Sequence, residues 1–501
     1  MTEEPHETDD PAVNGDPAAS GDPAVRGDRF SGGPARGFLS SLDADQRIFE
    51  ADLAVDRAHV VMLAEQGIIT ADDAGAILDA LDEVEEAGHG SLPEGEDVHE
   101  AIESAVIERV GPAGGRMHTA RSRNDEVATC IRYRLREDLL AAVEATLVLR
   151  EALTEAAAEH TETVMPGYTH LQPAQPTTVA HFLLSYESAV RRDTARLLAA
   201  YERTNRSPLG AAAFAGTPFE MDRERTAELL GFDGLVENSM DASSTRDFLL
   251  ESVGALATLA TTLSGLAEDL IVYSNREFLE LDDDYASTSS IMPQKKNPDT
   301  LELVRAVAGD AIGAFGGLAT TLKGLPRAYN RDLQRATPHA WETVDAVTDA
   351  TGVAAGAVAT ADWDEAALAG AAGEGFSTAT GVADLLASEG VPFRHAHEVV
   401  AEAAHGGAGT PDYDELDAAA QEVLGESLEA YVSREAVEEA LDPTASVAAR
   451  DSRGGPAPEA VTDQLDAAGE PRDAERSAVE DAREALAAAS ASLDTEVDEY
   501  A

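Results

Sequence analysis

Lysine is almost missing from this chain of 501 residues. Only three of its 36 basic residues are lysines (Lys295, Lys296 and Lys323), whereas 95 acidic residues set the formal charge at −59. An acidic surface poor in lysine is typical of proteins from a very salty cytoplasm, because at about 1 M salt the Debye length is roughly 3 Å and crowded carboxylates repel one another weakly. A lysine kept against this trend is a candidate functional residue. The acidic excess also argues against nucleic acid or an anionic membrane as the main partner.

Other absences narrow the class of protein further. The single cysteine, Cys130, excludes a disulfide framework and any cysteine-rich metal site. No run of about 18 apolar residues predicts a transmembrane helix, and no basic, apolar leader opens the chain. The 12 histidines are scattered, and neither a phosphate-binding loop nor a dinucleotide-binding fingerprint occurs. These features predict a soluble, cytoplasmic protein that uses no metal and no cofactor.

The apolar residues follow a helical period, which predicts an all-α fold. With 44% hydrophobic residues the chain can bury a large core. From about Thr245 an apolar stripe recurs at steps of three and four residues and predicts a helix of about 28 residues. Its members are Val253, Leu256, Leu259, Leu263, Leu266, Leu270 and Tyr273. Segments 137–161 and 178–204 show the same pattern, so we expect long helices packed against other subunits, with a monomeric bundle as the alternative.

Acidic residues are missing from four segments of a chain in which about one residue in five is acidic. The segments are Thr163–Tyr186, Arg206–Phe219, Tyr285–Pro298 and Ala311–Arg331. Three of them are rich in Gly, Pro, Ser, Thr, Gln and Asn, which is the composition of loops and not of a core. All three lysines lie in the last two segments. The pattern predicts that these segments bind a ligand bearing carboxylates or phosphates.

The segment Tyr285–Pro298 ends in Asn297 and Pro298, a good helix N-cap and a good first helical residue. A helix starting there would favour an anion at its N-terminus, close to Ser289, Ser290 and Lys295. The polar residues before it are typical of a lid that orders over a substrate, with a mobile surface loop as the alternative.

Two further stretches carry candidate chemistry. His170 lies in the stiff, proline-rich stretch Pro166–Pro176, where a purely structural histidine is the alternative. In His118–Glu126, Arg121 and Arg123 offer planar donors suited to carboxylates, with a solvated helix start as the alternative.

Several of these stretches together resemble the argininosuccinate lyases of the fumarase/aspartase superfamily. The loop Ser-Ser-Ile-Met-Pro-Gln-Lys-Lys-Asn-Pro-Asp at Ser289–Asp299 is similar to the superfamily's signature in its argininosuccinate lyase form. Further similar blocks are His118–Glu126, Pro166–Pro176, Asn238–Phe248, Val391–Glu398 and Arg453–Ala457. The resemblance extends from about residue 28 to the end of the chain. Adenylosuccinate lyases, a sister group, typically have His-Lys-Arg in place of Gln-Lys-Lys.

The resemblance implies an all-α fold in three domains whose long central helices assemble a homotetramer, with each active site shared between three subunits. We expect a disordered acidic tail over residues 1–28, an N-terminal helical domain over 29–120, a central bundle with the signature loop over 121–372 and a C-terminal helical domain over 373–501. It also implies a reversible anti elimination of argininosuccinate to arginine and fumarate, the last step of arginine biosynthesis, without metal or cofactor.

The resemblance assigns the catalytic roles to four residues. Ser289 would handle the Cβ proton of the substrate, held as an alkoxide with help from Lys295 and loop amides. His170 would be the second acid/base group, oriented by Glu302. Which of Ser289 and His170 is the base stays open, and Ser289 is favoured.

The substrate contacts implied by the resemblance come from several parts of the chain. They are Ser122, Arg123 and Asn124, then Thr169, Lys295 and Asn297 at the fumarate end, Tyr329 and Gln334 at the arginine end, Ser41 and Asp45 in the N-terminal arm, and the supporting pair Asp97 and His99. Two positions depart from the family: Thr337 stands where a lysine is usual, and Arg26–Phe30 reads Arg-Gly-Asp-Arg-Phe instead of Gly-Gly-Arg-Phe. The alternatives are a sister elimination enzyme such as adenylosuccinate lyase, or a non-catalytic structural relative of the kind found in eye lenses.

Overall fold

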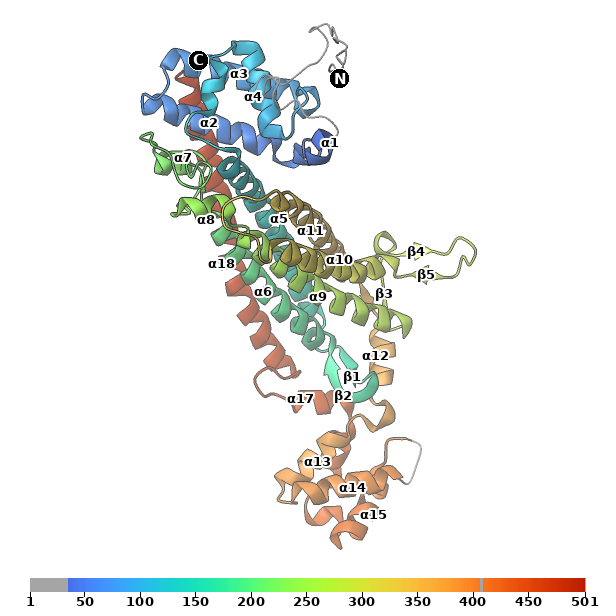
Figure 1. Cartoon of the computed structure of the whole chain (residues 1–501). Helices are drawn as coiled ribbons and strands as arrows, with labels where there is room; N and C mark the ends of the chain where they lie inside the picture. The colour runs from blue at the N-terminus through green and yellow to red at the C-terminus, as the bar shows by residue number, and fades with distance from the viewer. Residues whose placement is uncertain (1–34, 406–408, 501) are drawn as a thin grey trace, which may run out of the picture. The chain divides into compact units, whose positions relative to one another are not determined.

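The computed structural model describes residues 35–405 and 409–500, and Figure 1 shows a chain built of α-helices. The helices run from α1 (Ala35–Leu39) to α18 (Pro458–Asp498), with short 3-10 turns and three small two-stranded sheets between them. The fold is therefore all-α in class, as the apolar periodicity predicts. The tail predicted over residues 1–28 lies outside the described residues.

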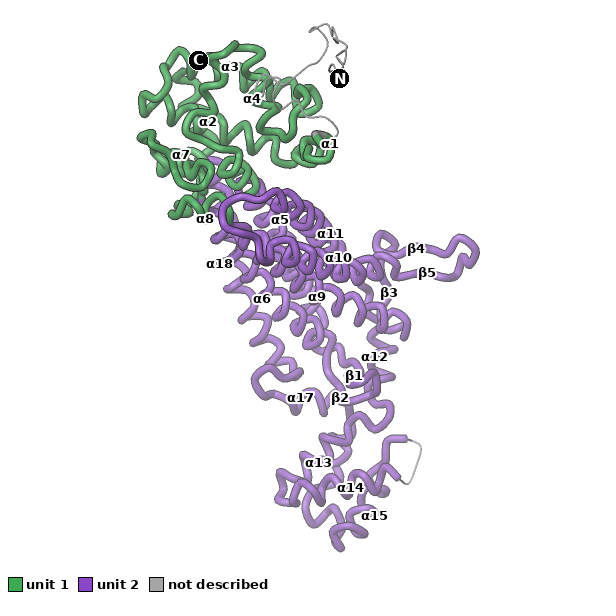
Figure 2. The backbone as a smooth tube through the Cα atoms, viewed as in Figure 1, with its two compact units in different colours: residues 1–131, 207–244, 489–501 green, residues 132–206, 245–488 purple. Residues whose placement is uncertain are grey.

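The chain divides into two compact units, coloured in Figure 2. Unit 1 comprises residues 1–131, 207–244 and 489–501, and unit 2 comprises residues 132–206 and 245–488. Two long helices, α5 (Arg123–Glu159) and α18, contribute residues to both units. The division into three domains stays a prediction.

Unit 1 is organised around α2 (Phe49–Glu65), which is apolar on most of its surface and buried along most of its length. It packs against α3 (Ala71–Ala87) and α7 (Arg223–Leu229). The helix α4 (Val98–Val110), packed on α3, begins at Asp97, whose side chain accepts a hydrogen bond from the amide of Glu100 at 2.8 Å. A helix buried on nearly all sides must satisfy any polar side chain it carries from inside the unit.

Unit 2 is centred on a bundle of long helices. Helix α9 (Asp247–Asn275) packs against α6 (Val179–Thr204), α10 (Asp299–Leu322) and α11 (Thr337–Ala359). All seven residues of its predicted apolar stripe are buried, which confirms the predicted helix within two residues at each end. The predicted segments 137–161 and 178–204 correspond to the second half of α5 and to α6.

Two helices of this bundle, α9 and α10, are long and apolar enough to cross a bilayer by length and composition alone. Neither helix contains an uninterrupted run of about 18 apolar residues, because Thr and Gly interrupt both of them. The sequence therefore predicted no transmembrane helix here. In α9, 44% of the most apolar window is buried, as in the core helix of a water-soluble bundle. Only 22% is buried in α10, which leaves a broad apolar face on the outside of the chain.

The helices α13 (Ala379–Ser388), α14 (Phe393–His405), α15 (Tyr413–Leu424) and α16 (Arg434–Leu441) form a hydrophobic core of their own within unit 2. Helix α15 begins with a capping box, in which the side chains of Asp412 and Glu415 each accept the other's backbone amide. Two short helices, α12 (Glu365–Ala372) and α17 (Pro443–Ala448), flank this group along the chain, and α8 (Ser239–Ser244) belongs to unit 1.

The stiff, proline-rich stretch around His170 folds as a hairpin of β1 (Val164–Thr169) and β2 (Gln172–Thr178), for which the sequence showed no strand pattern. Pro166 lies opposite Pro176, with a register shift before Tyr168. Proline cannot donate a ladder hydrogen bond, so it argues against a strand in most sheets. Here the sheet has only two strands, and each strand has one edge that needs no partner.

The helix after the signature loop begins one residue later than predicted. The N-cap of α10 is Pro298, which makes no side-chain cap, and Asn297 lies in β5 (Lys296–Asn297), paired with β4 (Ser287–Thr288). Asn297 is held extended by its partner strand and therefore does not cap the helix. The third sheet pairs β3 (Leu279–Glu280) with β6 (Asp362–Trp363).

Candidate active site

The signature loop folds as a hairpin, Ser287–Asn297, that projects from the bundle (Figure 1). Beyond the paired strands, the amide of Ser289 donates to the carbonyl of Lys295 at 2.9 Å and continues the ladder. The hydroxyl oxygen of Ser289 accepts hydrogen bonds from the amides of Met292 at 3.1 Å and Ile291 at 3.4 Å. The sequence thus places Ser289 in a turn whose amides point at its oxygen.

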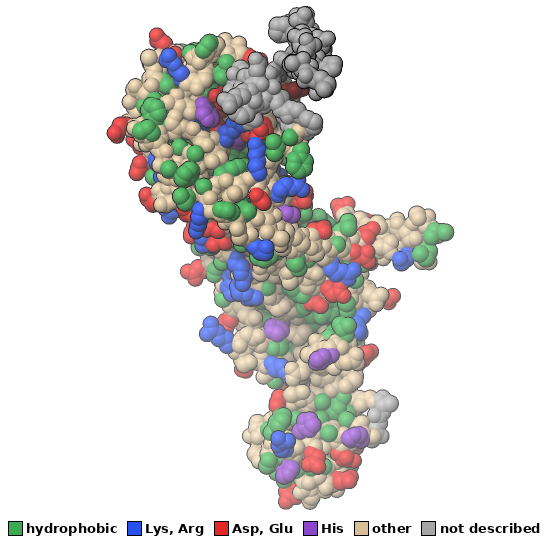
Figure 3. Space-filling model, viewed as in Figure 1, with side chains coloured by type: hydrophobic (Ala, Val, Ile, Leu, Met, Phe, Trp, Pro, Cys, Tyr) green, Lys and Arg blue, Asp and Glu red, His purple; other side chains and the backbone are tan. Residues whose placement is uncertain are grey.

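The tip of this hairpin is apolar and solvent-exposed. The side chain of Ile291 is 83% exposed and that of Met292 is 41% exposed, and Figure 3 shows hydrophobic side chains at the end of the projection. Exposed large apolar residues on a projecting loop are unusual in a surface rich in carboxylates. The hairpin therefore ends in an apolar tip that is open to solvent.

The two adjacent lysines of the hairpin have different surroundings. The ammonium of Lys296 forms ion pairs with Asp283 at 2.8 Å and Glu280 at 3.1 Å, and these carboxylates hold its pKa above the ordinary value. Lys295 is exposed, and its amide donates to the carbonyl of Met292. Lys296 therefore ties the hairpin to its own base, whereas the charge of Lys295 is the one that faces solvent.

His170 lies at the tip of the β1–β2 hairpin, between Thr169 and Gln172, which pair across the turn. Both central residues, His170 and Leu171, have positive φ angles of 56° and 58°, as in a two-residue turn of the mirror-image type. Leucine adopts this conformation only at a cost, histidine at a smaller one, and such strain is concentrated at functional sites. Both side chains are exposed.

Within the described part of the chain, no hydrogen bond joins His170 to Ser289 or to Glu302. Glu302 is exposed in the first turn of α10, one turn from the end of the hairpin. The predicted orientation of His170 by Glu302 is therefore not formed inside a single chain.

The block Ser122–Asn124 begins α5 in unit 1. A guanidinium nitrogen of Arg123 donates to Asp97 at 3.2 Å and lies 3.7 Å from Glu100. The hydroxyl of Ser122 accepts from the amide of Asn124 at 3.3 Å, and the Asn124 side chain donates to the carbonyl of Ala213 at 3.1 Å. The block is thus fixed on both sides and half-buried, and is not the solvated helix start left open as the alternative.

The N-terminal arm residues lie against the start of α4. The hydroxyl of Ser41 donates to Asp45 at 2.7 Å, and Asp45 accepts from the amide of Val98 at 3.3 Å. Burial raises the pKa of Asp45. Asp45 and Arg123 therefore bind to two adjacent residues at the start of α4, Asp45 to the amide of Val98 and Arg123 to the carboxylate of Asp97.

The residues predicted for the arginine end belong to unit 2. Tyr329 and Gln334 are half-buried around a short 3-10 turn before α11, and Thr337 is the first residue of that helix. Arg246 is fully buried beside Tyr329, and burial lowers its pKa to about 10.

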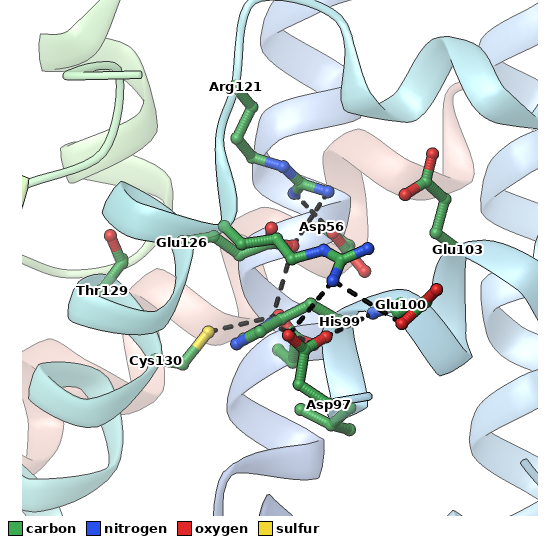
Figure 4. A network of polar contacts seen from close by, with 12 residues as sticks. Asp56, Asp97, His99, Glu100, Glu103, Arg121, Glu126, Thr129 and Cys130 are labelled. Carbon is green, nitrogen blue, oxygen red and sulfur yellow. Dashed lines mark hydrogen bonds and ion pairs between the residues drawn. The ribbon is translucent and has the colours of Figure 1, made fainter. Parts of the chain in front are cut away.

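The structure also contains a polar network that the residue patterns did not reveal (Figure 4). The guanidinium of Arg121 pairs with Asp56 on α2 and, at 2.9 Å, with Glu126 on α5. The Nδ1 atom of His99 lies 2.8 Å from Asp52 and 3.8 Å from Glu126. All five side chains are buried, so Arg121 is not available to a ligand, contrary to the expectation that it offers donors to a carboxylate.

Burial and charge shift the protonation of this network strongly. Burial alone would lower the pKa of His99, but Asp52 and Glu126 raise it to about 10, so His99 is a cation. Burial raises the pKa of Asp56 to about 6 against the opposing effect of Arg121, and burial also raises the pKa of Glu126. The network thus contains three carboxylates (Asp52, Asp56 and Glu126) and two cations (His99 and Arg121). Its net charge is zero when one of the carboxylates is protonated.

The donor set of this network does not suit a metal ion. Asp52, His99 and Cys130 offer ligand atoms within 4.8 Å of one another, as do Asp52, Asp56 and Glu126. However, Arg121 occupies the carboxylates of Asp56 and Glu126, and a protonated His99 has no lone pair to give. The groups are therefore one another's partners, and they fix the start of α5 on which Ser122–Asn124 lie.

The comparisons with known proteins agree with the motifs. A family described as Lyase matches residues 38–313, and one described as Argininosuccinate lyase C-terminal matches residues 376–448. The chain is 71% identical over 472 residues to the argininosuccinate lyase of Natronomonas pharaonis, which covers 94% of this chain and 96% of that protein. It is 67% identical over 475 residues to that of Haloarcula marismortui, covering 94% and 95%. The chain belongs to the argininosuccinate lyase family.

The solved structures place this argininosuccinate lyase family member among enzymes of the same fold. EDDS lyase, solved in complex with formate, matches with a TM-score of 0.84 and 35% identity, covering 93% of this chain and 95% of that one. A variant of the same enzyme with bound fumarate matches equally well. The two closely similar relatives come from haloarchaea, in agreement with the lysine-poor, acidic composition.

The buried network was missed in the sequence because its residues come from three separate segments, and only Arg121 and Glu126 lie in a block that resembles the family. A signal for it was present: Asp52, Asp56 and His59 recur at steps of four and three residues along an otherwise apolar helix. Acids at helical spacing on an apolar face predict buried partners, because a buried charge is costly unless it is paired. Nothing in the sequence says which residues those partners are.

Proposed function

We propose that this chain is an argininosuccinate lyase that reversibly eliminates fumarate from argininosuccinate and releases arginine, with no metal or cofactor. The observation that carries the proposal is the 71% identity to an argininosuccinate lyase over 94% of the chain, together with the signature hairpin. The fumarate bound to a variant of EDDS lyase supports the product at the level of the shared fold. Cytoplasmic arginine biosynthesis is the corresponding role.

The elimination removes a weakly acidic proton next to a carboxylate, and the resulting negative charge must be stabilised. We assign the removal of this proton to Ser289. A serine hydroxyl is a poor base, but the amides of Ile291 and Met292 already donate to its oxygen and would stabilise an alkoxide. Lys295, whose carbonyl accepts the amide of Ser289, is assigned to add positive charge for the same purpose.

His170 is assigned as the group that assists the departing guanidinium nitrogen, with Glu302 as its orienting partner. The strained turn that presents His170 supports a functional role, since positive φ at a residue other than glycine persists only where the surroundings enforce it. Because His170 and Glu302 do not meet within one described chain, the pair is proposed to form between subunits.

Substrate binding is assigned to groups that match the three carboxylates and the guanidinium of argininosuccinate. The block Ser122–Asn124 suits carboxylates, because it offers a hydroxyl, an amide and a guanidinium that are half-buried and already held in place. Thr169, Lys295 and Asn297 are assigned to carboxylates as well. Tyr329 and Gln334 are assigned to the arginine end, and Ser41 and Asp45 to the closing arm. What supports this assignment is that Asp45, which accepts from Ser41, and Arg123 are hydrogen-bonded to the adjacent residues Val98 and Asp97.

The proposed assembly is a homotetramer with sites shared between three subunits. The outward apolar face of α10 supports it: Leu303 is 70% exposed, Ile312 55% and Phe315 38%. An apolar face of this kind on a long helix is typical of subunit contacts. The C-terminal domain over 373–501 is likewise a proposal, supported by the family match that begins at residue 376.

The proposal is tested by mixing the purified protein with argininosuccinate in molar KCl and following fumarate by ultraviolet absorbance. Turnover is expected, and Ser289→Ala should abolish it while circular dichroism and the assembly mass stay unchanged. No fumarate at any salt concentration would refute the enzymatic role and favour a non-catalytic relative. Turnover of adenylosuccinate instead would favour the sister enzyme.

A further inference from the structure

The signature hairpin is held at its N-terminal end by an aromatic ring that rests on a glycine. Tyr285, two residues before the hairpin, packs against Gly356 of α11. A methyl group at Gly356 would lie 2.7 Å from Cε1 of Tyr285 and closer still to its Cζ and hydroxyl oxygen, where real Cβ atoms are never found. The ring therefore occupies the space that any side chain at position 356 would need.

The backbone gives no reason for a glycine at this position. Gly356 lies inside α11 with an ordinary helical φ, and in such a position glycine is less favourable than alanine. Gly352, one turn earlier on the same helix, has nothing within 4 Å of the place where a Cβ would stand. Of the two glycines, only Gly356 is covered by the tyrosine ring.

The backbone of Tyr285 is fixed as well as its ring. Its carbonyl accepts a hydrogen bond from the hydroxyl of Thr300, in the first turn of α10, and its amide donates to Asp282 at 3.0 Å. Ser287, at the start of the hairpin, donates to the carboxylate of Asp299. The entry to the hairpin is therefore attached to α10 through polar groups and to α11 through the ring.

The ring has room to leave this position. A cavity of about 400 Å³ lies beside it, between α11 and residues of α5 that include Glu151 and Glu155. Tyr285 itself is only half-buried. The ring could therefore turn into this cavity if a side chain at position 356 displaced it.

We infer that Tyr285 is a positioning residue for Ser289, and that Gly356 is the contact that makes this position possible. The inference rests on the proposed function, in which Ser289 takes the substrate proton. Only three residues lie between Tyr285 and Ser289, so a displacement of the ring is passed to the hydroxyl through a short, hydrogen-bonded stem. Small errors in the position of a reacting group reduce turnover strongly.

The test compares Gly356→Ala with Gly352→Ala in the full chain at molar KCl. Gly356→Ala should lower kcat at least tenfold with less than a twofold change in KM, while Gly352→Ala should behave as the wild type. A merely structural role would instead reduce the folded or assembled fraction, which circular dichroism and light scattering measure. Equal kcat values for Gly356→Ala and the wild type would overturn the inference.

A second substitution tests whether both positions act through the same contact. Tyr285→Leu removes the ring end that a methyl at position 356 would meet, and on its own should also lower kcat. The double variant with Gly356→Ala should be no slower than Tyr285→Leu alone. Losses that multiply, to a hundredfold or more, would show two independent defects and contradict the inference.

A protease that cleaves after lysine supplies a readout that does not depend on activity. Lys295 and Lys296 lie in the hairpin, and Lys323, exposed at the end of α10, is an internal reference. Gly356→Ala should accelerate cleavage at the hairpin at least threefold relative to Lys323, and Gly352→Ala should not. If the wild type fails to turn over argininosuccinate while this difference holds, the proposed function fails and the positioning contact stands; unchanged cleavage with an active wild type overturns the contact alone.

Discussion

Neighbouring residues of this chain have separate roles even where their chemistry is the same. Lys295 and Lys296 are consecutive, yet only Lys296 is paired, with Asp283 and Glu280. Both of those carboxylates are largely exposed, and pairs of this kind contribute little to stability and even less in molar salt. The scarcity of lysine in the chain therefore points to the hairpin as a functional segment. The ion pairs of Lys296 then distinguish it from Lys295, which has no such pairs within the described residues.

Lys295→Met should lower kcat by about a thousandfold, because it removes the charge assigned to stabilise the developing negative charge, a loss of the size seen for groups of this type. Lys296→Met, the same substitution one residue later, should change kcat less than about threefold in molar KCl, where its surface pairs are screened. Steady-state kinetics under identical salt compare the two. A larger loss for Lys296→Met would reverse the roles assigned to the pair.

The buried histidine His99 makes the stability of unit 1 decrease at alkaline pH. Its pKa is about 10 in the folded protein against an ordinary value of 6.5, so the stability that it contributes is complete below pH 6.5 and is lost as the pH rises through 10. Asp56 acts at lower pH. Because burial raises its pKa from 3.8 to about 6, its contribution to the stability of the fold falls as the pH rises from 3.8 to 6. The two windows do not overlap.

Urea unfolding at a fixed protein concentration should therefore show a decrease in the free energy of unfolding between pH 7 and 10. His99→Gln should remove most of this decrease and should cost about 3 kcal/mol at pH 7, because it leaves Asp52 and Glu126 without their buried cation. A variant with the same pH slope as the wild type would show that His99 is not the cation of the network.

At the scale of the element, the β1–β2 hairpin is built against its own turn preferences. The turn residues His170 and Leu171 both have positive φ, where Asn and Gly are preferred. Leu171 is 63% exposed and therefore recovers little by burial. The strain is a property of the turn that carries His170 at its tip.

Leu171→Asn should stabilise this hairpin by about 1 kcal/mol, because asparagine tolerates the left-handed conformation. Leu171→Ala keeps a Cβ without that tolerance and should give no gain. Slower hydrogen exchange of the β1 and β2 amides would report the stabilisation. Equal exchange in the two variants would mean that the turn is not strained.

The elements recognised from the sequence were those whose signal lies in one continuous pattern. The stripe Val253–Tyr273 predicted α9 closely because a single buried face decides where a long helix runs. The hairpin at Val164–Thr178 was missed because its prolines argue against a strand unless the partner strand is known. Asn297 was assigned as a cap for the same reason, since its pairing with Ser287 is a contact across ten residues.

The same limit applies to the site. The family blocks located Ser289, His170 and Ser122–Asn124, because each is a short run of adjacent residues. They could not locate the partners of Arg121, since Asp56 lies 65 positions earlier and becomes its neighbour only through the packing of α2 against the start of α5. Long-range polar pairs depend on the fold and leave no local pattern.

At the scale of the whole molecule, charge and assembly are coupled. With a formal charge of −59 per chain, bringing four chains together is opposed by repulsion that molar salt reduces. Unfolding and dissociation should therefore both become easier as KCl is lowered, and light scattering together with circular dichroism would follow them. Unchanged mass and stability in dilute buffer would remove the link to a salty cytoplasm.

The proposed assembly makes a prediction of its own about two equally exposed apolar residues. Ile312 on α10 and Phe393 on α14 are both 55% exposed. Ile312→Glu should reduce the mass in molar KCl below that of a tetramer, because it places a charge in the proposed contact between bundles. Phe393→Glu should leave the mass unchanged. If Ile312→Glu remains a tetramer, the α10 face is not the contact.

The composition of unit 1 from three separated stretches has a consequence for how the chain is made. Residues 489–500 belong to the same unit as residues 35–131, and within it Arg225 joins Glu65 to Glu496 while the carbonyl of Tyr500 abuts Gly75. A ribosome therefore synthesises the chain through residue 500 before the unit that contains residues 35–131 can be completed. Until then the apolar surface of α2 and α3 lacks part of its cover, and chaperones that hold nascent chains would find their binding site there.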